Sequence, residues 1–141
     1  MQFKTSITHH LVKSEDLNHH GTLYAGRTME WFVEAGFIAA ACWLQPANIV
    51  CHTIHSVTFT SPVQRGEIVE LISRIVYTGT SSLTAHISCT ANGRAVLSGF
   101  ILFIHVDMDG TKMPHGLVLE PSNEEERLLQ EQASQLKKSN S

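Results

Sequence analysis

The sequence predicts a domain of the α+β class, in which an antiparallel β-sheet wraps around one long central α-helix. The first observation is a helical segment at about residues 26–44 that is apolar almost all round, and such a helix must be covered by other structure. The second is the order of the other segments, since one strand-like segment precedes the helix and four follow it. Short turns join those four segments, which favours antiparallel pairing.

The first strand is predicted within residues 2–13, where Phe3 and Ile7 are apolar at alternating spacing. The helix follows from Gly26, and placing its residues at 100° steps gives an apolar arc of about 140°. The arc contains Met29, Phe32, Val33, Gly36, Phe37, Ala40, Trp43 and Leu44. Only a narrow strip is polar, formed by Arg27, Glu30 and Glu34. Pro46 ends the helix.

The four later strands are predicted at residues 49–60, 68–77, 83–90 and 94–106. Asn92-Gly93 lies between two alternating segments and is the clearest hairpin signal. We expect residues 1–120 to form a single domain, and residues 121–141 to form a C-terminal surface helix or tail. Ser122 is the expected N-cap of that helix. Its modest apolar face contains Leu128, Leu129 and Leu136.

The composition limits the class of function. The chain has 141 residues with a net charge of −3, and so lacks the basic surface that nucleic acid binding needs. Its three cysteines are widely spaced, which favours buried thiols in a reducing compartment such as the cytoplasm. The N-terminus lacks the layout of a signal peptide, and Glu30 and Glu34 interrupt the longest apolar segment, so we expect no membrane span.

The most informative segment is the polar stretch of residues 16–27 that leads directly into the helix. Unpaired backbone N–H groups and the positive end of the helix dipole face whatever lies in such a loop. A thioester carbonyl or a phosphate suits that environment. The segment therefore predicts a binding site at the helix N-terminus.

The segment and the order of elements resemble the hotdog-fold acyl-CoA thioesterases, in particular the cytosolic acyl-CoA hydrolase group, over about residues 10–115. The matching residues are Asn18, Gly21, Gly26, Glu34-Ala35-Gly36, Phe59-Thr60-Ser61-Pro62, Gly66, Gly79-Thr80-Ser81-Ser82 and Met113-Pro114. The loop is also similar to that of 4-hydroxybenzoyl-CoA thioesterases, whose acid falls at Asn18. It is similar as well to the Asn-x-His pair of plant acyl-carrier-protein thioesterases.

The resemblance implies catalytic roles for Asn18, Gly26, Glu34 and His20. The backbone N–H of Gly26 polarises the thioester carbonyl, and Asn18 orients the attacking water or shapes the loop through an Asx-turn. The usual acid of the family falls at position 33, which is Val33 here. The base is then either Glu34, which alternatively forms a salt bridge with Arg27, or His20.

The resemblance also implies that Gly79, Thr80, Ser81 and Ser82 bind the phosphates of coenzyme A, although the same residues suit a simple β-turn. Thr80 stands where the family often has an arginine. No cofactor is expected, because coenzyme A enters as part of the substrate. No metal site is expected either, since neighbouring histidines on a strand point to opposite faces. Related domains pair their sheets edge to edge, so homodimers assembled into tetramers or hexamers are implied.

The expected activity is hydrolysis of an acyl-CoA thioester to a free carboxylic acid and coenzyme A. One alternative is a non-catalytic acyl-CoA-binding or regulatory protein that lacks the helix acid, as Val33 suggests. Another is a hydratase or dehydratase, which needs a histidine and a carboxylate facing each other across a dimer.

Overall fold

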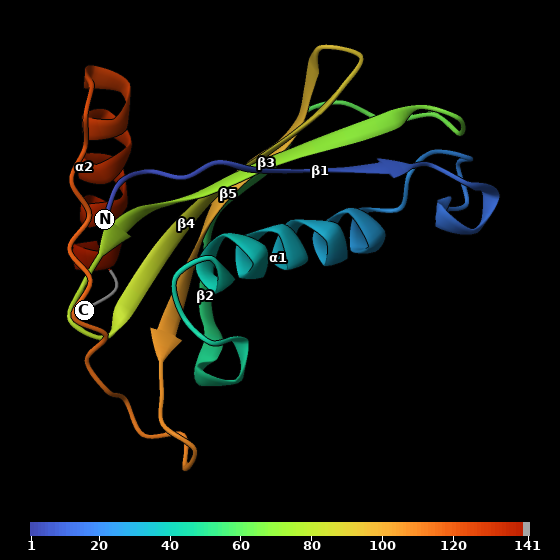
Figure 1. Cartoon of the computed structure of the whole chain (residues 1–141). Helices are drawn as coiled ribbons and strands as arrows, with labels where there is room; N and C mark the ends of the chain where they lie inside the picture. Colours follow the sequence, from blue (N-terminus) through green and yellow to red (C-terminus); the bar gives the residue numbers. More distant parts are fainter. Residues whose placement is uncertain (140–141) are drawn as a thin grey trace.

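The computed structural model describes residues 1–139, and its elements follow the predicted order (Figure 1). Strand β1 precedes the long helix, four strands follow, and a second helix ends the described chain. Their bounds are β1 Ser6–Leu11, α1 Ala25–Ala41, β2 Ile49–Phe59, β3 Ile68–Thr78, β4 Ser82–Ala91, β5 Arg94–His105 and α2 Glu124–Ser139. The predicted α+β class is confirmed.

The five strands form one antiparallel sheet in the order β1-β3-β4-β5-β2. The predicted hairpin joins β4 to β5, and both of its turn residues have positive φ, 49° at Asn92 and 77° at Gly93. Such a turn matches the twist of the flanking strands. Strands β1 and β2 are the two edges of the sheet, so among the described residues the edge of β2 that faces away from β5 has no partner strand.

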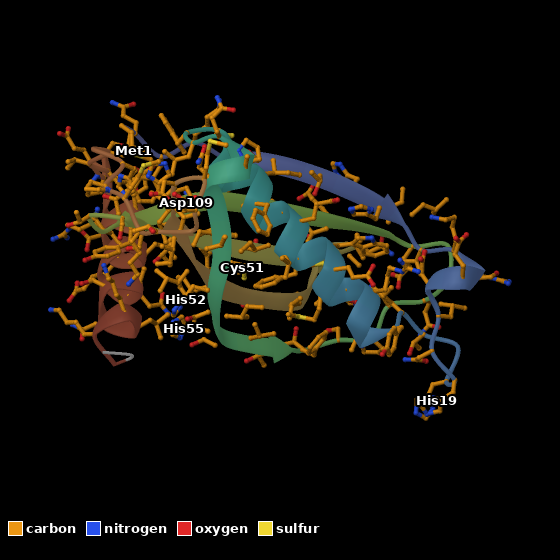
Figure 2. The ribbon with its side chains drawn as sticks, turned by 90° about the horizontal axis from the view of Figure 1, so that it is seen from below. Met1, His19, Cys51, His52, His55 and Asp109 are labelled. Atoms are coloured by element: carbon orange, nitrogen blue, oxygen red, sulfur yellow. The ribbon has the colours of Figure 1, made fainter. Side chains whose placement is uncertain are left out.

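Helix α1 crosses one face of the sheet and packs mainly on β3 and β4 (Figures 1 and 2). Small residues allow the close approach, since Ala35, Gly36 and Ala39 are buried around Phe32. The inner faces of the strands supply the rest of the main core, as Leu71 and other buried aliphatic side chains do.

One side of α1 is left uncovered by the sheet of the same chain. Glu30 and Glu34 are exposed, and Val33 and Phe37 are only partly buried. The neighbouring edge strand β2 also exposes apolar side chains, namely Val50, Ile54 and Phe59. Ile54 pairs with the core residue Ile101 and so faces the same side as α1, and an apolar surface extends from Val33 and Phe37 of the helix to Ile54 on the free edge of β2.

The helix is also shorter than predicted, because it ends at Ala41 and not at residue 44. The N–H groups of Trp43 and Leu44 both donate to the carbonyl of Ala40, which closes the last turn. Gln45 is extended (φ −68°, ψ 129°), as a residue before proline prefers. Strand β1, Ser6–Leu11, lies within the predicted residues 2–13.

Helix α2 does not stand apart from the sheet. Its Leu129 and Leu136 pack with buried Ala133 against Val76 and Phe100, in a second core on the face opposite α1. Leu128, which the sequence placed on the apolar face, is 55% exposed. Residues 140–141 of the predicted tail lie outside the described residues.

The cap of α2 also differs from the prediction. Asn123 accepts a hydrogen bond at Oδ1 from the backbone N–H of Glu126 (2.8 Å), which makes Asn123 the N-cap. The predicted cap, Ser122, instead donates its own backbone N–H to Glu126 Oε1 (2.9 Å). Within residues 1–139, no helix is both long and apolar enough to cross a membrane.

Candidate active site

Asn18 organises the loop that leads into α1. Its Oδ1 accepts the backbone N–H groups of His20 (2.8 Å) and Thr22 (3.2 Å), and its Nδ2 donates to Thr22 Oγ1 (3.1 Å). Gly21 completes the turn with a φ of +79°. The Asx-turn that was one of the two interpretations of Asn18 is therefore present, and one N–H of its amide remains for a ligand.

His20 lies at the tip of the same loop and is exposed. Its ring is stacked at an angle on that of His19, with 3.9 Å between the centroids. Figure 2 shows His19 at the far end of the molecule, pointing away from the sheet. The structure brings His20 neither into the cavity that Gly26 and Glu34 line nor into the one that Asn18 lines.

The N-terminus of α1 has the free donors that the sequence predicted. Tyr24 is the N-cap residue, and its side chain makes no capping hydrogen bond. The first N–H groups of the helix, those of Ala25, Gly26 and Arg27, have no partner within the helix itself. The Tyr24 ring lies over Gly26, where an added Cβ would be only 2.8 Å from Tyr24 Cζ. Glycine at this position therefore makes room for the Tyr24 ring.

Gly26 opens onto a groove of about 620 Å³ between α1 and β2, a size that accommodates a small organic ligand. The lining residues are Gly26, Met29, Glu30, Val33, Glu34, Phe37 and Ile54. The apolar members form a hydrophobic wall, and two carboxylates lie along its rim. The structure thus brings Gly26 and Glu34 together in one cavity.

The two carboxylates differ in their partners. Glu30 accepts from Arg27 Nη1 at 3.0 Å, and Arg27 Nε lies 3.2 Å from Asp16 Oδ1. Glu34 has neither an ion pair nor a hydrogen bond among the side chains of residues 1–138, so the predicted alternative of a salt bridge between Glu34 and Arg27 is wrong. An unpaired, solvated carboxylate at a groove rim is free to accept a proton.

Asp16 and His10 were not identified from the sequence. Asp16 is buried and accepts the backbone N–H of Lys13 at 2.8 Å, so with Arg27 it ties the loop to α1. His10 stacks on Trp31, with ring centroids 4.3 Å apart. Burial lowers the pKa of His10, whereas the charge of Glu34 acts in the opposite direction. The sequence did contain a signal for Asp16, since it is an acidic residue that precedes Arg27 in the first turn of the predicted helix and could have been paired with it.

A second cavity, of about 360 Å³, lies on the other side of the α1 N-terminus. Asn18 and Ala25 line it together with Thr28 and Thr60. Asn18 and Gly26 therefore flank the same helix end but face different cavities.

The predicted phosphate-binding turn of residues 79–82 lies at the opposite end of the sheet (Figure 1). Ser82 pairs with Ile104 and Ile49 with His105, whereas Phe59 pairs with Leu97 near the loop of Asn18. The eleven residues of β2 span about 33 Å between these ends. One protomer therefore does not bring the two parts of the predicted site together. No group of three or more potential metal ligands occurs among the described residues.

Comparisons with known proteins identify the family of the chain. The sequence pattern of the Thioesterase superfamily matches residues 20–97, which is more than half of the chain. An uncharacterised acyl-CoA thioester hydrolase of Bacillus subtilis is 28% identical over 126 residues, covering 85% of this chain and 72% of the relative.

Two solved structures are also similar. A hexameric acyl-CoA thioesterase superposes with a TM-score of 0.88 at 27% identity, over 96% of this chain and 89% of that one. A hexameric hotdog-fold thioesterase of Campylobacter jejuni gives a TM-score of 0.69 at 25% identity, over 88% and 94% of the two chains. The expected hotdog fold is confirmed, and the chain belongs to the thioesterase superfamily.

Proposed function

We propose that this protein hydrolyses acyl-CoA thioesters to a free carboxylic acid and coenzyme A. The observation that carries the proposal is the groove in which uncapped N–H groups of a helix N-terminus, an apolar wall and an unpaired carboxylate meet. A thioester has the matching parts: a carbonyl that needs polarising, an apolar acyl chain and a bond that water must attack. The names of the similar proteins support the same substrate class.

In the proposed reaction the acyl chain lies against Val33 and Phe37, with the carbonyl oxygen toward the N–H of Gly26. Glu34 takes a proton from water as the water oxygen bonds to the carbonyl carbon. The N–H group and the helix dipole stabilise the resulting oxyanion. Collapse of this intermediate breaks the C–S bond, and the proton taken up by Glu34 passes to the leaving sulfur, which releases coenzyme A as the thiol. Asn18 holds the loop that leads into α1 through its Asx-turn.

A thiol-release assay over a series of acyl-CoA chain lengths tests the activity. General bases contribute about 10²-fold or more, so Glu34→Gln lowers kcat by that order. Glu30→Gln is the matched control, because Glu30 lies one turn earlier on the same helix but is paired with Arg27. His20→Ala separates the two candidate bases, and we expect it to leave kcat within a few-fold. No turnover with any acyl-CoA by a folded oligomer would contradict the proposed activity.

The working unit is a homodimer in which the free β2 edges pair antiparallel. Ile54 is the middle residue of β2, is 40% exposed and lines the groove. Pairing about Ile54 places the 79–82 turn of one copy beside the α1 N-terminus of the other, which joins the two parts of the site. It also satisfies an open sheet edge. Further assembly into tetramers or hexamers is supported by the two similar structures that are hexameric.

We place the protein in a reducing, cytoplasmic compartment. Cys42, Cys51 and Cys89 are all free, and burial raises the pKa of Cys89 to about 11, which keeps that thiol protonated. Size-exclusion chromatography with light scattering tests the assembly, and a monomer at micromolar concentration would contradict it.

A further inference from the structure

A small cavity beside the 79–82 turn is lined by positively charged and hydroxyl side chains. Its volume is about 240 Å³, below the usual range for whole ligands, so it suits a single small group. The polar lining consists of His52, Thr80, Ser81, Ser82, Lys112 and Lys137. Lys137 comes from α2 and Lys112 from the segment after β5, and Figure 2 shows His52 on the side of β2 toward α2.

The ammonium of Lys137 is held directly on the turn. Its Nζ donates to Ser82 Oγ at 3.1 Å and lies 5.6 Å from the centroid of the Tyr77 ring. An added Cβ at Gly79 would collide with both Lys137 Nζ and Ser82 Oγ. Gly79 does not have a positive φ, so the turn itself does not require glycine there. The glycine instead makes room for the lysine.

The charge in the cavity is not neutralised. Neither Lys112 nor Lys137 has an ion-pair partner within residues 1–139, and no carboxylate lines the cavity. Two unpaired ammonium groups are thus gathered in a chain whose net charge is −3. Binding of a negatively charged ligand would offset the repulsion between these two ammonium groups.

The backbone of the turn is also prepared for an anion. Carbonyl groups repel a phosphate, but those of residues 80–82 are already bonded to N–H donors. Thr80 O accepts from the N–H of His115 (3.2 Å), Ser81 O from the N–H of His105 (2.7 Å) and Ser82 O from the N–H of Gly79 (2.9 Å). The hydroxyl and ammonium groups are therefore the polar groups left for a ligand.

We infer that Lys112 and Lys137 form a cationic clamp for a phosphate ester in the nucleotide half of the coenzyme A substrate. The inference rests on the proposed function and adds two residues outside the turn that the family resemblance indicated. They supply the positive charge that Thr80 lacks at the position where the family often has an arginine. In the β2-paired dimer the clamp of one copy serves the groove of its partner.

Kinetics of Lys112→Met and Lys137→Met, singly and together, test the clamp, because methionine keeps the length of the stem and removes the charge. Lys138→Met is the matched control, since it removes the same charge from the next residue of α2 outside the cavity lining. Each substrate is compared as its CoA ester, its 3′-dephospho-CoA ester and its pantetheine ester. Binding of free coenzyme A is measured by calorimetry alongside, and thermal unfolding checks the fold.

The clamp predicts a KM for acyl-CoA raised about tenfold in each single variant and further in the double variant, with kcat little changed. Acyl-pantetheine turnover stays the same, and the KM of the unaltered protein rises with salt more steeply than that of the double variant. Lys137→Arg restores most of the affinity. A larger effect with CoA than with 3′-dephospho-CoA assigns the clamp to the 3′-phosphate, and an equal effect assigns it to the pyrophosphate.

Equal KM values and equal coenzyme A affinities in the double variant and the unaltered protein would overturn the clamp while leaving the proposed hydrolysis intact. Conversely, lysine-dependent binding of coenzyme A without turnover of any thioester would uphold the clamp and contradict the hydrolysis. A matching loss in Lys138→Met would also overturn the clamp, because general surface charge would then account for the effect.

Discussion

Gly99, in the middle of β5, is the position where the contact between helix and sheet is most sensitive to one added methyl group. A Cβ there would lie 2.9 Å from Val57 Cγ2, 3.1 Å from the carbonyl oxygen of His55 and 3.1 Å from Phe32 Cζ. Overpacking of this kind costs about 1–3 kcal/mol. Replacing a glycine within a strand also raises the free energy of unfolding by about 0.5–1 kcal/mol, because alanine loses less backbone entropy on folding. We therefore expect Gly99→Ala to lower the free energy of unfolding by about 1–2 kcal/mol.

The neighbours of Gly99 cannot easily move away. The His55 oxygen belongs to the backbone of β2, which pairs with β5 and is bulged between His55 and Thr58, where Ser56 has a φ of 56°. Phe32 is completely buried in the middle of α1. The added volume therefore displaces either the edge strand or the helix, and both of these elements line the groove.

Thermal or urea unfolding of the variant measures the effect, which corresponds to about 2–8 °C in Tm for a chain of this size. Ser98→Ala is the control, because Ser98 is the exposed neighbour on the same strand and should change stability by about 0.5 kcal/mol or less. Phe32→Leu should cost less in the Gly99→Ala background than alone. A Gly99→Ala protein as stable as the unaltered one would refute the packing argument.

Three further predictions concern stability. The hydrogen bonds of Arg94 hold the pKa of Glu67 at about 2. Glu67→Gln should therefore lower the free energy of unfolding by about 1 kcal/mol at pH 7, after allowance for solvent screening. In urea titrations this difference should vanish as the pH falls from about 4.5 to 2. Asn123→Ala should cost about 1 kcal/mol through loss of the α2 cap, whereas Ser122→Ala should cost clearly less; the reverse order in Tm would contradict the assigned cap. Burial lowers the pKa of His86, so the unfolded chain binds the proton more readily and the free energy of unfolding should fall as the pH drops below about 6.5. His86→Leu should flatten the plot of stability against pH in this range, and an unchanged slope would rule out His86 as the cause.

Most of the fold could be predicted from local patterns, for reasons visible in particular elements. In β3 and β5, apolar residues either alternate with polar ones or follow one another without interruption, and both strands end at turn residues. Their predicted bounds therefore differ from the observed ones by one residue. The position of α2 required tertiary information. The residues of α2 that pack against the sheet have helical spacing, and they are Leu129, Ala133 and Leu136. An alanine carries too little apolar surface, however, to distinguish a docking face from a solvated one in the sequence.

The site was predictable only in its parts. The pattern around Asn18 and Gly26 indicated a helix N-terminus, and the structure has one with free donors. The sequence carries no information on which cavity each residue faces, and so it grouped Asn18, His20 and Glu34 although only Glu34 shares the groove of Gly26. The clamp lysines were missed because Lys112 and Lys137 lie far from residues 79–82 in sequence and meet that turn only through folding.

The family usually has its acid at position 33, where this chain has Val33, and the nearest carboxylate is that of Glu34. The packing of the helix gives a physical reason for this difference. Met29, Val33 and Phe37 follow one another at four-residue intervals and form an apolar stripe about 12 Å long on the groove side of α1. A carboxylate at position 33 would interrupt this stripe at its centre, where burial against an acyl chain would penalise its charge. Glu34 is rotated by about 100° around the helix, so its side chain stays exposed at the rim while the apolar wall remains continuous. Val33→Asp therefore tests both roles at once: it should weaken binding of long acyl chains more than short ones, and equal losses for all chain lengths would argue against an acyl-binding wall.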